Sequence, residues 1–298
     1  MKVTILSDLP IIAAFSATAL WLVSNILSKK VSVSLGFITM SAIVLPLGML
    51  PMAIGIAVVG VHAIPIYSIV IAALAGIFLT LGFLLLYKTL ETEQLTNTVA
   101  LGELQPAILV LFGIFALGES VNMIQAVSMM IIFAGAVLVV TVEGLSINKK
   151  LIPACFAMLS WALYWVLITY SVHASGSTFS MPVLVSRITG SAIAIAYFAA
   201  NKGKVMKYMH SAFSGRRRRE LGIIVAFVSI IAIVDASGDF IFAYVTASNA
   251  LAIGSALTAL SPIAASIAGF FIYKDRLTAP QLAGFAIMVV GALSLAIL

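Results

Sequence analysis

The sequence predicts an all-α integral membrane protein with ten transmembrane helices in two inverted five-helix repeats. Three observations lead to this prediction. The composition is too apolar for a water-soluble domain, a long segment recurs without a gap in the second half, and the basic residues gather in alternate loops. Together they place one five-helix unit in residues 1–146 and a second in residues 147–298.

The composition places the chain in a bilayer. Hydrophobic residues make up 63% of the 298 residues and charged residues only 9%, whereas soluble domains carry about 25% charged residues. Cys155 is the one cysteine, so no disulfide can form within the chain. No small-residue cleavage site follows a short apolar run after Pro10, so we expect the first helix to be retained. A multi-pass protein of the plasma (inner) membrane is predicted.

The repeat aligns residues 82–138 with residues 238–294. Glu119 aligns with Asp275, so an acidic residue recurs as well. Identical pairs include Gly82 and Gly238, Pro106 and Pro262, Gly113 and Gly269, Gln125 and Gln281, and Gly135 and Gly291. Duplication of an apolar segment is how many secondary transporters are built.

Crossing the hydrocarbon core takes about 20 apolar residues. The predicted helices span residues 9–28, 34–60, 65–89, 93–115, 120–143, 151–173, 178–200, 221–246, 248–271 and 277–298. In the first half the separators are Lys29 and Lys30, His62, Glu91 and Glu93, and Glu119. Lys149 and Lys150 separate the halves, and His173, the basic segment 202–219, Ser248 with Asn249, and Lys274 to Arg276 separate the remaining helices.

Lys and Arg fall almost entirely in the odd-numbered loops, with the largest cluster in residues 202–219. Basic loops remain in the cytoplasm, so both termini are predicted to lie outside. Because five helices per copy is an odd number, the second copy is then inverted relative to the first. The run Arg216–Arg219 is interpreted as an orienting loop, with binding of anionic lipid or nucleic acid as the alternative.

Four ionisable residues lie deep in the predicted helices: Glu103, Arg187, Asp235 and Asp239. A charge at the bilayer centre costs about 2.5–3.5 kcal/mol, so each is expected to face a cavity or a partner. Arg187 can neutralise only one acid, and Asp235, at a similar depth, is the expected partner. Acids without a partner should be protonated, which suits coupling to protons. The alternative is a structural Arg–Asp pair beside neutral acids.

Two aromatic and polar trios occupy the first helix of each copy. Trp21, Ser24 and Asn25 stand at positions i, i+3 and i+4, and Trp161, Tyr164 and Trp165 repeat that spacing, so each trio shares one helix face. Trp161 falls near mid-span rather than at an interface, which favours a substrate pocket over a lipid anchor. Arg187 is a further candidate for substrate binding. Additional polar candidates are Tyr87, Asn97, Gln105, Tyr244 and Ser261.

Small residues on the fifth and tenth helices indicate close helix packing. Gly135 and Ser128 are seven residues apart on the fifth helix, and Gly284 and Gly291 are seven apart on the tenth. Such stripes let the backbones of two membrane helices approach each other.

The segment Tyr273–Gly284 resembles the acidic loop and following helix of EamA-type transporters, in the drug/metabolite transporter superfamily. Ala116–Ser120 with Gln125 is the first-copy version. Other positions similar to the family pattern are Pro106, Pro262, Trp21, Trp161 and Arg187. The resemblance covers nearly the whole chain and implies a ten-helix carrier that often exports small metabolites. Gln105 and Ser261 stand where the family commonly has Glu, and members are usually drawn with cytoplasmic termini.

These observations predict a secondary active transporter for an amino acid or related solute, with export implied by the resemblance. A facilitative carrier, exchanger or channel is the alternative, and a non-transporting receptor is a further one. No phosphate-binding loop or catalytic constellation is found, so neither an ATP-driven pump nor an enzyme is expected. We expect no cofactor, metal or nucleic acid, and a monomer or weak homodimer in contact with lipid.

The orientation can be tested with reporter fusions. A reporter attached after Leu298 should be active outside the cytoplasm, and one inserted within residues 202–219 should be active inside, because the basic loops resist translocation. A cytoplasmic C-terminus would contradict the predicted orientation.

Overall fold

The computed structural model describes residues 2–93, 95, 98, 105–140, 152–214, 218–274 and 278–296, and across these residues every regular element is helical. The α-helices are α1 (Lys2–Leu35), α2 (Phe37–Leu47), α3 (Met49–Val59), α4 (Ile66–Thr92), α6 (Gln105–Phe115), α7 (Met123–Val140), α8 (Ile152–Ala174), α9 (Ser180–Ala200), α10 (Lys202–Phe213), α11 (Arg218–Ala247), α12 (Leu251–Thr258), α13 (Ser261–Ala268) and α14 (Ala279–Ala296). A π-helical turn, η3 (Gly269–Tyr273), continues α13.

The helices have the length and exterior of membrane helices. Seven described segments are long and apolar enough to cross a bilayer, and three shorter apolar helices accompany them. Val58, Ile66, Phe115 and Met123 are 78–82% exposed, so large apolar side chains cover the outside. An exposed apolar surface of this kind suits contact with lipid. The prediction of an all-α, multi-pass membrane protein is confirmed.

Several predicted boundaries were wrong for identifiable reasons. α1 continues through Lys29 and Lys30 to Leu35 and ends at Gly36, whose φ of 78° is favourable only for glycine. The predicted helix 34–60 corresponds to the apolar span Phe37–Val59, which is interrupted at Gly48. The break lies between Pro46 and Pro51, and proline cannot donate a backbone hydrogen bond. The lysines near the end of α1 therefore belong to a helix rather than to a loop.

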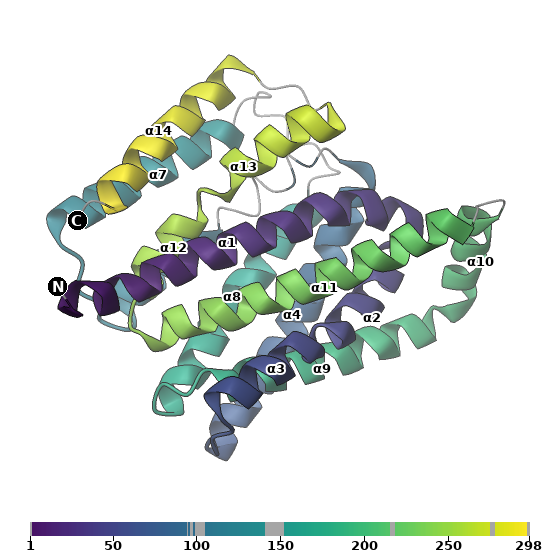
Figure 1. Ribbon diagram of the computed structural model, residues 1–298, viewed down its shortest axis with the longest axis horizontal. Helices are drawn as coiled ribbons and strands as arrows, with labels where there is room; N and C mark the ends of the chain where they lie inside the picture. Colours follow the sequence, from purple (N-terminus) through teal and green to yellow (C-terminus); the bar gives the residue numbers. More distant parts are fainter. Residues whose placement is uncertain are drawn as a thin grey trace.

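The basic segment after α9, predicted as a loop, contains the helix α10. Its lysines Lys202, Lys204 and Lys207 are exposed whereas Val205 is buried, so the helix has one polar and one packed face. The Tyr208 hydroxyl donates to the carbonyl of Val33 at 2.8 Å and thereby attaches α10 to the end of α1. Figure 1 shows α10 at the opposite end of the molecule from the two termini.

Four long helices form the centre of the molecule. α1 lies along α11 and α4 lies along α8, and both pairs join the first half of the chain to the second (Figure 1). α9 packs across α4 and against α2 and α3, and α6 packs on α12. α7 and α14 form a separate pair at one side of the molecule.

The α7–α14 pair confirms the predicted packing of small residues. A Cβ atom on Gly135 would lie 2.6 Å from the carbonyl oxygen of Gly284, and one on Gly291 would lie 2.9 Å from the carbonyl oxygen of Ser128. Both positions must therefore remain without a side chain for the helices to approach so closely.

Glu119 links the two halves through a helix N-terminus. Its carboxylate accepts hydrogen bonds from the backbone N–H groups of Leu251, at 2.9 Å, and Ala252, at 2.7 Å. The first N–H groups of a helix lack partners within the helix, and a carboxylate also stabilises the positive end of the helix dipole. The acidic residue of the first copy thus caps α12 of the second.

Candidate functional site

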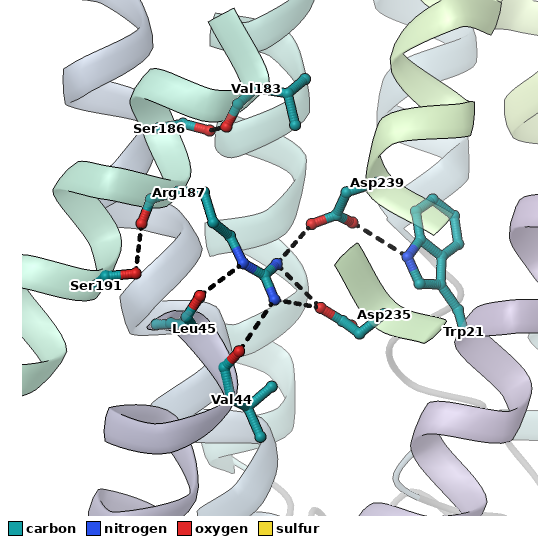
Figure 2. Close-up of polar contacts among 9 residues, drawn as sticks. All are labelled: Trp21, Val44, Leu45, Val183, Ser186, Arg187, Ser191, Asp235 and Asp239. Carbon is teal, nitrogen blue, oxygen red and sulfur yellow. Dashed lines mark hydrogen bonds and ion pairs between the residues drawn. The ribbon is translucent and has the colours of Figure 1, made fainter. Parts of the chain in front are cut away.

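The centre of the site is the guanidinium group of Arg187, which α9 carries into the interior. The side chain is 0% exposed. Its Nη1 atom lies 3.0 Å from Oδ2 of Asp235 and 3.0 Å from Oδ2 of Asp239, and Nη2 lies 3.1 Å from the same oxygen of Asp235 (Figure 2). The two aspartates are one turn apart on α11, so the helix presents both to one cation.

The opposite side of the guanidinium faces the end of α2. Nε donates to the carbonyl of Leu45 at 3.2 Å and Nη2 to that of Val44 at 3.5 Å (Figure 2). A Cβ atom on Gly48 would clash with Nη2 of Arg187. The helix break at Gly48 therefore provides both the acceptors and the space that Arg187 needs.

The cluster holds two acids for one base. Asp235 contacts two nitrogen atoms of Arg187, whereas Asp239 contacts one, and the second oxygen of Asp239 accepts a hydrogen bond from Nε1 of Trp21 at 3.1 Å. If both acids are ionised, the three side chains carry a net charge of about −1. The sequence predicted one acidic partner for Arg187, and the structure shows two. Asp239 therefore has one contact fewer with the guanidinium than Asp235.

A cavity lies beside the aspartates, between α1, α4, α6, α8, α11 and α12. It encloses about 780 Å³ of space, including the part that opens to the outside. The lining residues are Trp21, Asn25, Leu79, Phe83, Leu86, Thr98, Gln105, Pro106, Leu109, Trp161, Tyr164, Trp165, Asp235, Asp239, Phe242 and Thr258. A mostly apolar wall with a few polar groups is typical of a small-molecule site.

Aromatic rings form much of the wall. Trp21, Trp165 and Phe242 contact one another, with ring centroids 4.8–5.9 Å apart, and Tyr164 lies edge-on to Trp165 at 4.9 Å. Phe83 lines the cavity and also lies near the guanidinium of Arg187, whose central carbon is 5.5 Å from the ring centroid. These tilted contacts fix the rings in place.

The two tryptophans of the first helices occupy matching positions in the two halves. A Cβ atom on Gly82 would lie 2.6 Å from Nε1 of Trp161, and one on Gly238 would lie 2.7 Å from Nε1 of Trp21. The repeat therefore conserves the space for each indole as well as the tryptophan itself. The sequence shows both pairs of residues, but only the structure shows that each glycine accommodates a tryptophan from the other half.

The structure gathers most of the predicted site residues around the cavity. Trp21, Asn25, Trp161, Tyr164, Trp165, Asp235 and Asp239 line it, as does Gln105. Ser24 is buried outside the lining, and Arg187 lies behind the aspartates. Tyr87, Tyr244 and Ser261 are not among the lining residues, whereas Glu103 and Asn97 lie outside the described residues.

Two aromatic members of the wall were missed. Phe242 lies three residues after Asp239 on the same helix face, so helical spacing from the aspartates could have found it. Phe83 aligns with Asp239 in the repeat, so the alignment could have identified it.

The sequence matches the model of the EamA-like transporter family twice, over residues 8–141 and 148–297, and the chain belongs to this family. It is therefore an integral membrane transporter of the drug/metabolite type with two copies of the family unit. No curated protein matches the sequence. A solved structure titled "Crystal structure of protein" is similar with a TM-score of 0.66 and 16% identity, over 96% of this chain and 95% of that one, which supports the fold.

The shared guanidinium predicts an unusual pattern of stability. Asp235→Asn and Asp239→Asn should each cost only about 1–2 kcal/mol, because the other carboxylate still contacts Arg187. The double variant should lose about 3–5 kcal/mol, since a buried cation is left unpaired. Adding Arg187→Gln to the double variant should restore much of that loss. Thermal unfolding of the purified proteins measures each effect.

Glu220→Gln, at an exposed acid in the first turn of α11, is the control for removing a carboxylate from the same helix. Losses that simply add, with no recovery in the triple variant, would show that the three side chains do not act as one cluster.

Proposed function

We propose that the protein is a secondary active transporter that moves a small solute through the central cavity in exchange for protons. The observation that carries the proposal is the pair of nearly buried carboxyl groups that share one guanidinium in the cavity wall. A carboxyl group whose charge is incompletely balanced can take up and release a proton, or exchange it for a solute. The location between the two halves of the chain is typical of substrate sites in transporters with internal repeats.

The arrangement of the helices supports ten spans in two inverted repeats. Residues 1–146 and 147–298 are the proposed units. α1 of the first unit lies along α11 of the second, and α8 of the second lies along α4 of the first, which is the reciprocal pairing that a two-fold relation requires. The matching contacts of Trp21 with Gly238 and Trp161 with Gly82 support the same relation.

Helix breaks beside the cavity suit alternating access. α12 ends at Thr258, which lines the cavity, and α13 begins at Ser261 after a two-residue turn. On the other side of Arg187, α2 and α3 meet at Gly48. Interrupted helices next to a binding site are a common feature of secondary transporters, because they allow parts of a helix to move separately.

In the proposed cycle Asp239 carries the proton and Arg187 positions the carboxylates. Arg187 keeps the two acids close together and holds Asp235 through two contacts. Asp239 lines the cavity and can respond to its contents. Export across the plasma (inner) membrane is the direction and location that we propose, with the termini outside.

Flux in proteoliposomes that contain a pH-sensitive dye tests the proposal. Amino acids, amines, nucleosides and sugars would be added one at a time. At least one should change the internal pH, with saturation and counterflow, because a coupled carrier exchanges the solute for protons. Asp239→Asn should abolish the pH change, while Glu220→Gln should retain it.

The alternatives give different results in the same assay. Saturable flux that does not respond to pH would indicate a facilitative carrier, and flux without saturation would indicate a channel. No flux of any tested solute would favour a receptor.

A further inference from the structure

The cavity wall limits which charged group a solute can present. Among the described lining residues, none is lysine, arginine or histidine, and two are aspartates. Arg187 is fully buried behind them, and its three nitrogen atoms bond to the aspartates and to carbonyl groups of α2. A solute carboxylate or phosphate would therefore meet no available cation in this wall.

The charge of the cluster favours a cation instead. One guanidinium faces two carboxyl groups, so ionisation of both leaves about one negative charge unbalanced in a site of low polarity. Among the described residues, the titratable side chains that face the aspartates from neighbouring helices are Arg187 of α9, Tyr87 of α4 and Tyr164 of α8, and Arg187 is the one base in this set. The imbalance can be removed by a proton or by a positively charged group from the cavity.

Asp239 is the carboxyl group best placed to receive that positive charge. Asp235 is held by Nη1 and Nη2 of Arg187, whereas Asp239 is held by Nη1 and by the indole N–H of Trp21. An indole donor contributes no net charge. Binding of a cation to Asp239 would therefore complete the charge balance without separating Asp235 from Arg187.

The rings beside Asp239 suit the same class of solute. Trp21, Trp165 and Phe242 form a cluster in the cavity wall, and the faces of such rings attract cations that lie within about 6 Å. They also cover apolar groups. Asn25, Gln105 and Thr258 add uncharged polar groups to the wall. The cavity wall thus combines a negatively charged group with aromatic surface. This combination is expected of a site that binds a cationic nitrogen attached to an apolar group.

We infer that the transported solute is an organic cation, a protonated amine or quaternary ammonium group on an aromatic or apolar body, with Asp239 as its counter-ion. The inference rests on the proposed transport function and names its substrate class. It gives Arg187 the role of positioning the aspartates, in place of the substrate-binding role that the sequence suggested. Because the proton and the cation neutralise the same carboxylate, they cannot occupy it together, which gives one-for-one exchange a physical basis.

Four ligands of similar shape test the inference: phenethylamine, the uncharged 2-phenylethanol, the anionic 3-phenylpropanoate and zwitterionic phenylalanine. Their binding to the purified full-length protein in a neutral detergent would be measured by calorimetry and by the shift in unfolding temperature. Phenethylamine should bind and stabilise the protein, phenylalanine should bind more weakly, and the alcohol and the acid should show no binding. Benzyltrimethylammonium should bind as well, since it needs no proton of its own.

Asp239→Asn should weaken phenethylamine binding by about 10- to 100-fold, the loss expected for one charge-assisted contact. Glu220→Gln should bind as the wild type does. The unfolding temperature of each variant without ligand shows whether it is folded, so that a loss of binding can be separated from a loss of structure.

Three outcomes would overturn the inference: equal or tighter binding of the acid or the alcohol, unchanged phenethylamine affinity in folded Asp239→Asn, or no binding of either cation. Transport is measured separately. Binding of the amine without flux in proteoliposomes would contradict the transport proposal and leave the ligand class intact. Flux of an anionic or neutral solute, without binding of either cation, would support the transport proposal and contradict the ligand class.

Discussion

The buried guanidinium of Arg187 is the interaction on which the rest of the site depends. A cation removed from water is costly unless its hydrogen-bond donors and its charge are both satisfied. Its neighbours supply what it needs: α11 provides the aspartates, α2 provides the carbonyl groups, and the break at Gly48 between α2 and α3 provides the space. Changes in any of these helices would alter the position or charge of the carboxyl groups that face the cavity.

The two halves of the chain share a framework but differ in chemistry. The tryptophan that packs on a glycine occurs in both halves, through Trp161 on Gly82 and Trp21 on Gly238. At the next position the repeat diverges, because Phe83 in the first half aligns with Asp239 in the second. The first half thus contributes an apolar ring over the guanidinium, and the second contributes the charge. Duplication explains the shape of the cavity, whereas divergence explains its charge.

Much of the fold was predictable because apolar length and duplication are properties of the sequence itself. The Gly135 and Gly291 contacts followed from small residues at helical spacing. The site was predictable only in part. Spacing shows that Asp235 and Asp239 share a face, but not that one cation lies opposite both, since that depends on how α9 crosses α11. The helix α10 was missed, because it is held by contacts with distant residues, such as the hydrogen bond from Tyr208 to Val33.

One guanidinium shared by two carboxyl groups should leave one of them free to bind either a proton or a solute. Infrared difference spectroscopy of the purified protein tests it most directly, because a protonated carboxyl group has a carbonyl band that a carboxylate lacks. Such a band is expected at low pH, and it should be lost when phenethylamine is added at constant pH and be absent in Asp239→Asn. A spectrum without the band, or a band that persists unchanged in Asp239→Asn, would contradict the account.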